Sequence, residues 1–159
     1  RNPERNRAMI LMLLDTGLRA SELINIKLDD IDFARRLIKV LGKGNKERLV
    51  PFSKRTGRSI YEYVLPLEPR ELLFLFNRNS LAHLTSQLGR LAGIRGSVHP
   101  HRFRHTFAIT FLRNGGDIYT LQEILGHSTF EMVRHYLALA QIDIESAHQR
   151  ASPVENWQL

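Results

Sequence analysis

One basic and aromatic segment organises the second half of the chain. It begins His99-Pro100-His101-Arg102-Phe103-Arg104-His105-Thr106-Phe107-Ala108 and continues to Asn114. At about 100° per residue, Phe103, Phe107 and Phe111 fall on one stripe. The sequence therefore predicts a helix over 101–114 that packs its phenylalanines on a core, and Gly115-Gly116 ends it.

The same helix places His101 and Arg104 side by side, because they stand three residues apart. An imidazole next to a guanidinium is an unfavourable pair near a core, and an anion bound between them would resolve the conflict. The alternative for this helix taken alone is a solvated basic face.

Upstream of this segment, the chain begins with a second core helix. Asn2 caps it, and it runs to about Asp15 and ends at Gly17. Residues 8–14 are apolar on every side, which predicts complete burial. A short helix over 20–24 follows, and it leaves Arg19 at the mouth of the turn between the two helices.

The segments between these two regions predict a small antiparallel sheet. Residues 31–33 and 37–41 are β-type runs, and residues 47–51 alternate as an edge strand does. Residues 42–46 form the turn before the last strand and carry Lys43 between two glycines.

The remaining sequence is helical apart from one ambiguous segment. Helices are expected over 53–65, 80–92, 117–125, 128–136 and 142–149, with Gly126 ending the third of these. Residues 72–76 form either a strand or a buried loop. The fold class is mainly α with a small antiparallel β-sheet (α+β), in one domain spanning 1–159.

Composition agrees with a basic globular domain. The 159 residues include 23 Lys and Arg against 16 Asp and Glu, which gives a net charge of +7 and favours a polyanionic partner. The chain has no cysteine, so disulfides and thiolate catalysis are excluded. Its longest apolar run is far shorter than the roughly 20 residues that span a bilayer, and no signal peptide opens it.

Four short segments closely resemble the tyrosine recombinases, the phage integrase type. They occur in the family's order, and the resemblance as a whole runs from about Arg5 to Gln149. The segments are Thr16-Gly17-Leu18-Arg19-Ala20-Ser21-Glu22-Leu23, the Lys43 turn with residues 46–51, the segment 99–108, and Leu125-Gly126-His127-Ser128 with Tyr136 nine residues after the histidine. Each of these residues taken alone is more often structural; the ordered set makes chance improbable.

The resemblance implies an active site of six residues: Arg19, Lys43, His101, Arg104, His127 and Tyr136. The arginines and His127 would hold the scissile phosphate. Tyr136 would attack it and form a 3′-phosphotyrosine, with His101 accepting its proton and Lys43 protonating the departing 5′ oxygen. No metal or other cofactor is expected.

Two further residues are candidates for supporting roles. Glu22 in the first segment either buttresses an arginine or is an exposed charge on a short helix. His105 is expected to pack behind the site.

The resemblance also sets expectations about partners. The expected partner is double-stranded DNA, and the expected assembly on recombining DNA is a tetramer, while the isolated chain is expected to be a monomer. The expected location is the cytoplasm, for a protein encoded by a prokaryotic cell or by a phage. The sequence opens without an initiator Met. We interpret it as lacking the family's N-terminal helical domain. The tail 151–159 either packs on a neighbouring protomer or is a free end.

Three rival interpretations remain. A type IB topoisomerase uses the same groups and the same covalent link. A DNA-binding module without catalysis would share the basic surface. A zinc protein is suggested by His99, His101 and His105, but Arg102 stands where the zincin pattern requires Glu.

Overall fold

The computed structural model describes residues 2–42, 46–67, 71–126, 131–140 and 144–154. Its helices are α1 (Pro3–Thr16), α2 (Ala20–Ile24), α3 (Lys54–Val64), α4 (Arg78–Leu91), α5 (Pro100–Arg113), α6 (Ile118–Leu125), α7 (Glu131–Ala140) and α8 (Ile144–Ala151), with a short 3₁₀ helix over Leu28–Asp30. The strands are β1 (Ile31–Asp32), β2 (Leu37–Leu41) and β3 (Glu47–Pro51). The predicted fold class is confirmed.

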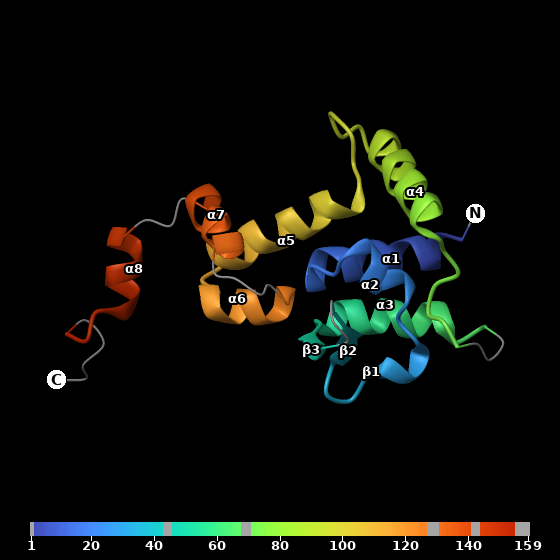
Figure 1. The fold of residues 1–159 in the computed structure, drawn as a ribbon, viewed down its shortest axis with the longest axis horizontal. Helices are drawn as coiled ribbons and strands as arrows, with labels where there is room; N and C mark the ends of the chain where they lie inside the picture. Colours follow the sequence, from blue (N-terminus) through green and yellow to red (C-terminus); the bar gives the residue numbers. More distant parts are fainter. Residues whose placement is uncertain (1, 43–45, 68–70, 127–130, 141–143, 155–159) are drawn as a thin grey trace.

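Helix α1 lies at the centre of the molecule, packed against α3 on one side and α5 on the other (Figure 1). The side chain of Asn2 accepts a hydrogen bond from the N–H of Arg5, which caps the helix as predicted. Met9, Met12 and Leu13 are fully buried. The prediction of burial on every side was wrong, because Leu14 is 39% exposed at a groove between α1, α4 and α5.

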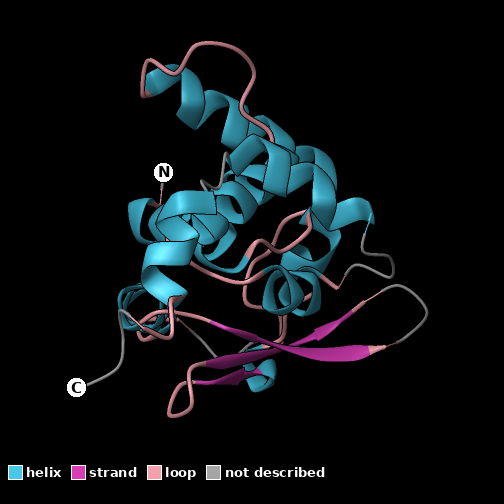
Figure 2. Ribbon diagram, turned by 90° about the vertical axis from the view of Figure 1, so that its left-hand side faces the viewer, coloured by secondary structure: helices cyan, strands magenta, loops and turns pink. Residues whose placement is uncertain are grey.

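The sheet is antiparallel in the order β1-β2-β3, so β3 is an edge strand as predicted. Most of the helices lie to one side of it (Figure 2). Ile38 pairs with Val50 and Val40 pairs with Arg48 across the two longer strands. Because side chains alternate along a strand, Arg48 shares the inner face with three buried aliphatic residues.

Several predicted boundaries need correction. Strand β1 ends one residue early, at Asp32, and α4 starts two residues early, at Arg78, because Asn77 caps it. Helix α7 continues four residues past Tyr136, and α8 lies two residues later than expected.

The ambiguous segment 72–76 is a connection rather than a strand, and it is buried only in part, since Leu75 is 70% exposed. Leu72 forms an isolated bridge with Lys27, while Leu73 and Phe74 are fully buried. In the described ranges, no helix combines the length and the apolar character needed to cross a membrane.

Candidate active site

Arg104 on α5 is the most deeply buried charged side chain of the site, with 2% of its surface exposed. Its Nη1 donates to the carbonyl of Gly17 and its Nη2 to the carbonyl of Leu125, both at 2.7 Å. These carbonyls lie at the C-terminal ends of α1 and α6, where the helix dipole favours a cation. Burial, reinforced by Arg19, lowers the pKa of Arg104 to about 10, which keeps it protonated at neutral pH.

Gly17 allows the end of α1 to approach α5 and α6 this closely. Its φ of +62° is a left-handed conformation that favours glycine. A Cβ atom there would meet the ring of Phe107 and would lie 2.8 Å from Leu125. The glycine that ends the helix is therefore also required for the contact that orders Arg104.

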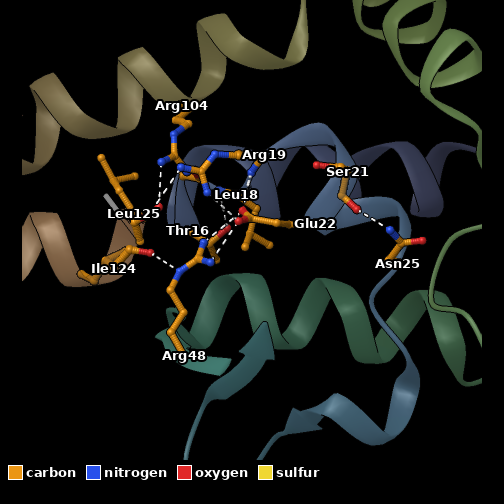
Figure 3. Close-up of polar contacts among 12 residues, drawn as sticks. Thr16, Leu18, Arg19, Ser21, Glu22, Asn25, Arg48, Arg104, Ile124 and Leu125 are labelled. Carbon is orange, nitrogen blue, oxygen red and sulfur yellow. Dashed lines mark hydrogen bonds and ion pairs between the residues drawn. The ribbon is translucent and has the colours of Figure 1, made fainter. Parts of the chain in front are cut away.

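Arg19 precedes α2 and is held by Glu22 in its first turn (Figure 3). The backbone N–H of Arg19 donates to Oε2 of Glu22 at 2.8 Å, and its Nη1 donates to Oε1 at 2.8 Å. The Arg19 side chain remains 35% exposed, whereas the Glu22 side chain is only 4% exposed. Glu22 thus buttresses the arginine, and the alternative of an exposed helix charge is wrong.

A third arginine, Arg48 on β3, completes the cluster. Its Nη1 and Nη2 donate to the two oxygens of Glu22 at 2.9 and 3.0 Å, and its side chain is 13% exposed. Burial acts to raise the pKa of Glu22. Hydrogen bonds from Arg48 and the Arg19 backbone, with the charges of both arginines, outweigh it and leave the pKa below its ordinary value.

The C-terminal end of α6 connects all three arginines. The carbonyl of Ile124 accepts from Nε of Arg48 at 2.8 Å, that of Leu125 from Arg104, and that of Gly126 from Nη2 of Arg19 at 3.4 Å. Three consecutive carbonyls therefore each accept from a different arginine. Figure 3 labels two of these residues, Ile124 and Leu125. A hollow of about 360 Å³ adjoins Arg19 and Glu22 and extends to Gly42.

Within this cluster, three guanidinium groups face one carboxylate. The excess of positive charge is built into the fold, since each group is fixed by several hydrogen bonds. Such a site suits an anion with two or more oxygens, because guanidinium groups bind phosphate and carboxylate oxygens in pairs.

Tyr136 on α7 lies beside this cluster and is 4% exposed. Its ring packs against His105 at 5.3 Å between centroids, and His105 in turn packs against His101 at 4.3 Å. Burial raises the pKa of the Tyr136 phenol, while the charges of Arg104 and Arg19 act to lower it. The phenol is therefore protonated at neutral pH and needs a base to act as a nucleophile.

The two histidines beside Tyr136 are suited to the neutral state. Burial lowers the pKa of His101, and the neighbouring charges of His105 and Arg104 lower it further. Burial, followed by the charge of His135, also lowers the pKa of His105. A neutral imidazole can accept a proton, so both rings can serve as a base at neutral pH.

Helix α7 is fixed to α5 at its C-terminal end. Arg113, the last residue of α5, donates to the carbonyls of Leu139 at 3.3 Å and Ala140 at 3.5 Å. Val133, Tyr136 and Ala140 form the buried face of α7. The helix that carries the tyrosine is therefore held by apolar packing along one face and by Arg113 at its end.

The structure brings together, from three segments of the chain, Arg19 and Glu22, then His101, Arg104 and His105, and finally Tyr136. Lys43 and His127 lie outside the described residues. Arg48 was not among the predicted site residues. The sequence did contain a signal for it. Alternation along the strand places Arg48 on the same face as Val50, and a charged side chain on a buried face needs a partner of opposite charge.

No group of three or more His, Cys, Asp or Glu side chains suited to a metal occurs in the part of the chain that the structure describes. The cluster is instead rich in arginine, a residue type that repels cations. The arrangement is thus suited to an anion next to a tyrosine hydroxyl.

Comparisons with known proteins agree with a site of this kind. The model of the phage integrase family matches residues 1–142. The chain belongs to that family. It is 36% identical to tyrosine recombinase XerC of Staphylococcus epidermidis over 94% of its own length and 54% of that protein. The chain thus spans about half the length of the curated relatives it matches.

Two solved structures share the fold. The crystal structure of XerA recombinase superposes with a TM-score of 0.80 at 32% identity, covering 94% of this chain and 59% of that one. The XerH site-specific recombinase bound to difH substrate, in a pre-cleavage complex, gives a TM-score of 0.75 at 25% identity over 96% of this chain and 47% of that one.

Proposed function

We propose that this chain is the catalytic domain of a site-specific tyrosine recombinase. It would cleave and rejoin strands of double-stranded DNA through a covalent 3′-phosphotyrosine. The observation that carries the proposal is the placement of Tyr136 against a cluster in which Arg19 and Arg104 supply excess positive charge.

The arginines bind and stabilise the phosphate in this mechanism. Arg19 and Arg104 hold the non-bridging oxygens of the scissile phosphodiester. Negative charge on these oxygens grows in the pentacoordinate transition state, so donors fixed in advance lower its energy more than that of the ground state. His127 adds a hydrogen bond to the same phosphate, as the family resemblance implies.

Tyr136 attacks the phosphorus and transfers its proton to His101. The bond between phosphorus and the 5′ oxygen breaks, and Lys43 protonates that oxygen as it leaves. The lowered pKa of His101 keeps its imidazole neutral and ready to accept the proton. His105 packs against both rings and holds their spacing.

The phosphotyrosine bond conserves the energy of the phosphodiester, so rejoining needs only the reverse attack by a 5′ hydroxyl. ATP is not required. The arginines supply the charge neutralisation that a divalent ion supplies in other phosphoryl-transfer enzymes.

Two properties of the chain support double-stranded DNA as its partner. One is the net charge of +7; the other is the likeness to the XerH complex with its difH substrate. We further propose that the chain is one domain of a longer, cytoplasmic protein that recombines as a tetramer. The tail 151–159, of which residues 155–159 lie outside the described ranges, would contact the neighbouring protomer. The isolated chain would be a monomer that binds DNA weakly.

Formation of a covalent adduct tests the proposal. The chain is incubated with a pool of nicked duplexes of randomised sequence, denatured in SDS and resolved by electrophoresis. The chain should form an adduct that Tyr136→Phe abolishes and that the exposed control Tyr61→Phe retains. No adduct from the unmodified chain, or an equal amount from Tyr136→Phe, would overturn the proposal.

A second assay distinguishes the recombinase from a topoisomerase. Sequencing of the adducts identifies preferred duplexes, and two copies of such a site are then tested for strand exchange. Relaxation of supercoils without any exchange would assign the chain to the topoisomerase class.

A further inference from the structure

We propose that Arg48 is a positioning residue that keeps the Arg19 guanidinium available to the phosphate by neutralising Glu22. This inference rests on the proposed function, because it names a further residue that the same site requires. It concerns a side chain on β3, which would not touch the DNA or the reacting atoms.

The Glu22 carboxylate is buried and fully paired. Its two oxygens accept four hydrogen bonds, two from the Arg48 side chain, one from the Arg19 side chain and one from the Arg19 backbone. A carboxylate with 4% of its surface exposed must be paired, since an unpaired buried charge is very costly. Arg48 supplies the larger, bidentate share of that pairing.

Because Arg48 makes two of the four hydrogen bonds to Glu22, the Arg19 guanidinium donates only one. One of its terminal nitrogens bonds Glu22, while the other makes a 3.4 Å contact with the carbonyl of Gly126. Its side chain is 35% exposed, so it can turn a donor toward an incoming phosphate. Without Arg48, Glu22 would draw the second nitrogen as well, and Arg19 would become a closed bidentate pair.

The net charge of the cluster also indicates that Arg48 favours phosphate binding by offsetting Glu22. With three arginines and Glu22 the cluster carries two net positive charges. Removing only the charge of Arg48 leaves one, and removing the charges of Arg48 and Glu22 together restores two. The effects of the two substitutions on phosphate binding are therefore expected to oppose each other, not to add.

Arg48 also fixes the turn that leads to His127. Its Nε holds the carbonyl of Ile124 at 2.8 Å. A Cβ atom on Gly126 would lie 3.1 Å from the guanidinium carbon, so the turn lies directly against Arg48. One side chain therefore connects β3, α2 and the end of α6.

The test is a double-mutant cycle on the whole 159-residue chain with Arg48→Gln, Glu22→Gln and the double variant. Two readouts are used: binding of inorganic phosphate by calorimetry, and the single-turnover rate of adduct formation on the preferred nicked duplex. Arg48→Gln should weaken phosphate binding and slow the adduct by about tenfold, the size expected when a charged hydrogen bond is diverted. The double variant should recover most of that loss.

A matched control pair is Arg58 and Glu62 on α3, which form an exposed ion pair at 2.7 Å away from the site. Arg58→Gln should leave both readouts unchanged. Melting temperatures separate folding defects from the proposed effect, because a folding defect lowers the melting temperature together with both readouts, whereas the loss of positioning lowers both readouts at a temperature where every variant is still folded.

The possible outcomes separate this inference from the proposed function. If the unmodified chain forms no adduct, the proposed function fails. If it forms one and the double variant is as slow as or slower than Arg48→Gln, or if Arg48→Gln equals the unmodified chain, the positioning role of Arg48 is wrong.

Discussion

The two halves of the candidate site are held in different ways. The arginine half, made of Arg19, Arg48, Arg104 and Glu22, is fixed by hydrogen bonds and ion pairs from α2, β3, α5 and α6. In the nucleophile half, made of Tyr136, His105 and His101, the described contacts include ring contacts, apolar packing of α7 on α5, and hydrogen bonds from Arg113 to the end of α7.

This difference has a physical reason. Groups that stabilise a developing charge act best when their dipoles are oriented in advance. A nucleophile must instead move toward phosphorus as the bond forms, and apolar contacts are less directional than hydrogen bonds. The arrangement predicts that substitutions in the arginine half cost more stability than comparable ones in the nucleophile half.

The largest effect is expected for Arg104→Lys. A single ammonium cannot span the carbonyls of Gly17 and Leu125, so one buried acceptor loses its partner, at about 1–3 kcal/mol of unfolding free energy. The rate of adduct formation should fall by about 10²–10³, as for loss of one preorganised donor. Denaturant unfolding and single-turnover kinetics measure the two quantities.

Arg102→Lys is the control for this substitution, since Arg102 lies on the same helix but is exposed. It should change neither quantity appreciably. Similar rates for the two variants would mean that the arginine half does not depend on the bidentate placement of Arg104.

A smaller effect is expected for Gly126→Ala. The φ of +62° costs an L-residue about 1–2 kcal/mol. The added Cβ would also crowd the Arg48 guanidinium at 3.1 Å. Gly93→Ala is the matched control, because Gly93 has a φ of +69° with open space around it.

Both glycine variants should lose unfolding free energy, and Gly126→Ala should lose more. Only Gly126→Ala should slow the adduct. Equal losses in the two variants, with unchanged kinetics, would show that the turn before His127 tolerates displacement of Arg48.

The smallest effect concerns pH and the nucleophile half. The pKa of His101 and that of His105 lie below the ordinary value of about 6.5 that an unfolded chain shows. At a pH between the folded-state pKa and the unfolded-state pKa of these histidines, the unfolded state binds more protons. The unfolding free energy therefore rises with pH in that range. The unfolding free energy should therefore fall as the pH is lowered from about 6.5 through the folded pKa of each histidine.

Replacing both histidines with glutamine should make this part of the pH profile flatter, whereas the exposed His83→Gln should leave it unchanged. If the double variant shows as steep a profile as the parent chain, other groups cause the loss of stability in acid. The pKa of His101 would then not be lowered, and the proposed base would not be neutral for that reason.

Local signals in the sequence were sufficient for most of the fold. Asn2, Ser53 and Asp117 cap α1, α3 and α6 through their side chains, and Gly17 and Gly126 end helices in the left-handed conformation. These effects act within a few residues. The boundaries that failed, such as the end of α7, depend on packing against α5 and not on a local stop signal.

The sequence by itself determined the family, the fold class and the identities of the candidate groups, because the four ordered segments and the helical periodicities are properties of the chain alone. Only the tertiary structure decided how those groups share charge. Glu22, Arg48 and the carbonyls at the end of α6 are distant in sequence, and folding brings them together. Long-range pairing of this kind has no local pattern, because each residue satisfies its hydrogen bonds with partners that the packing of helices and strands provides.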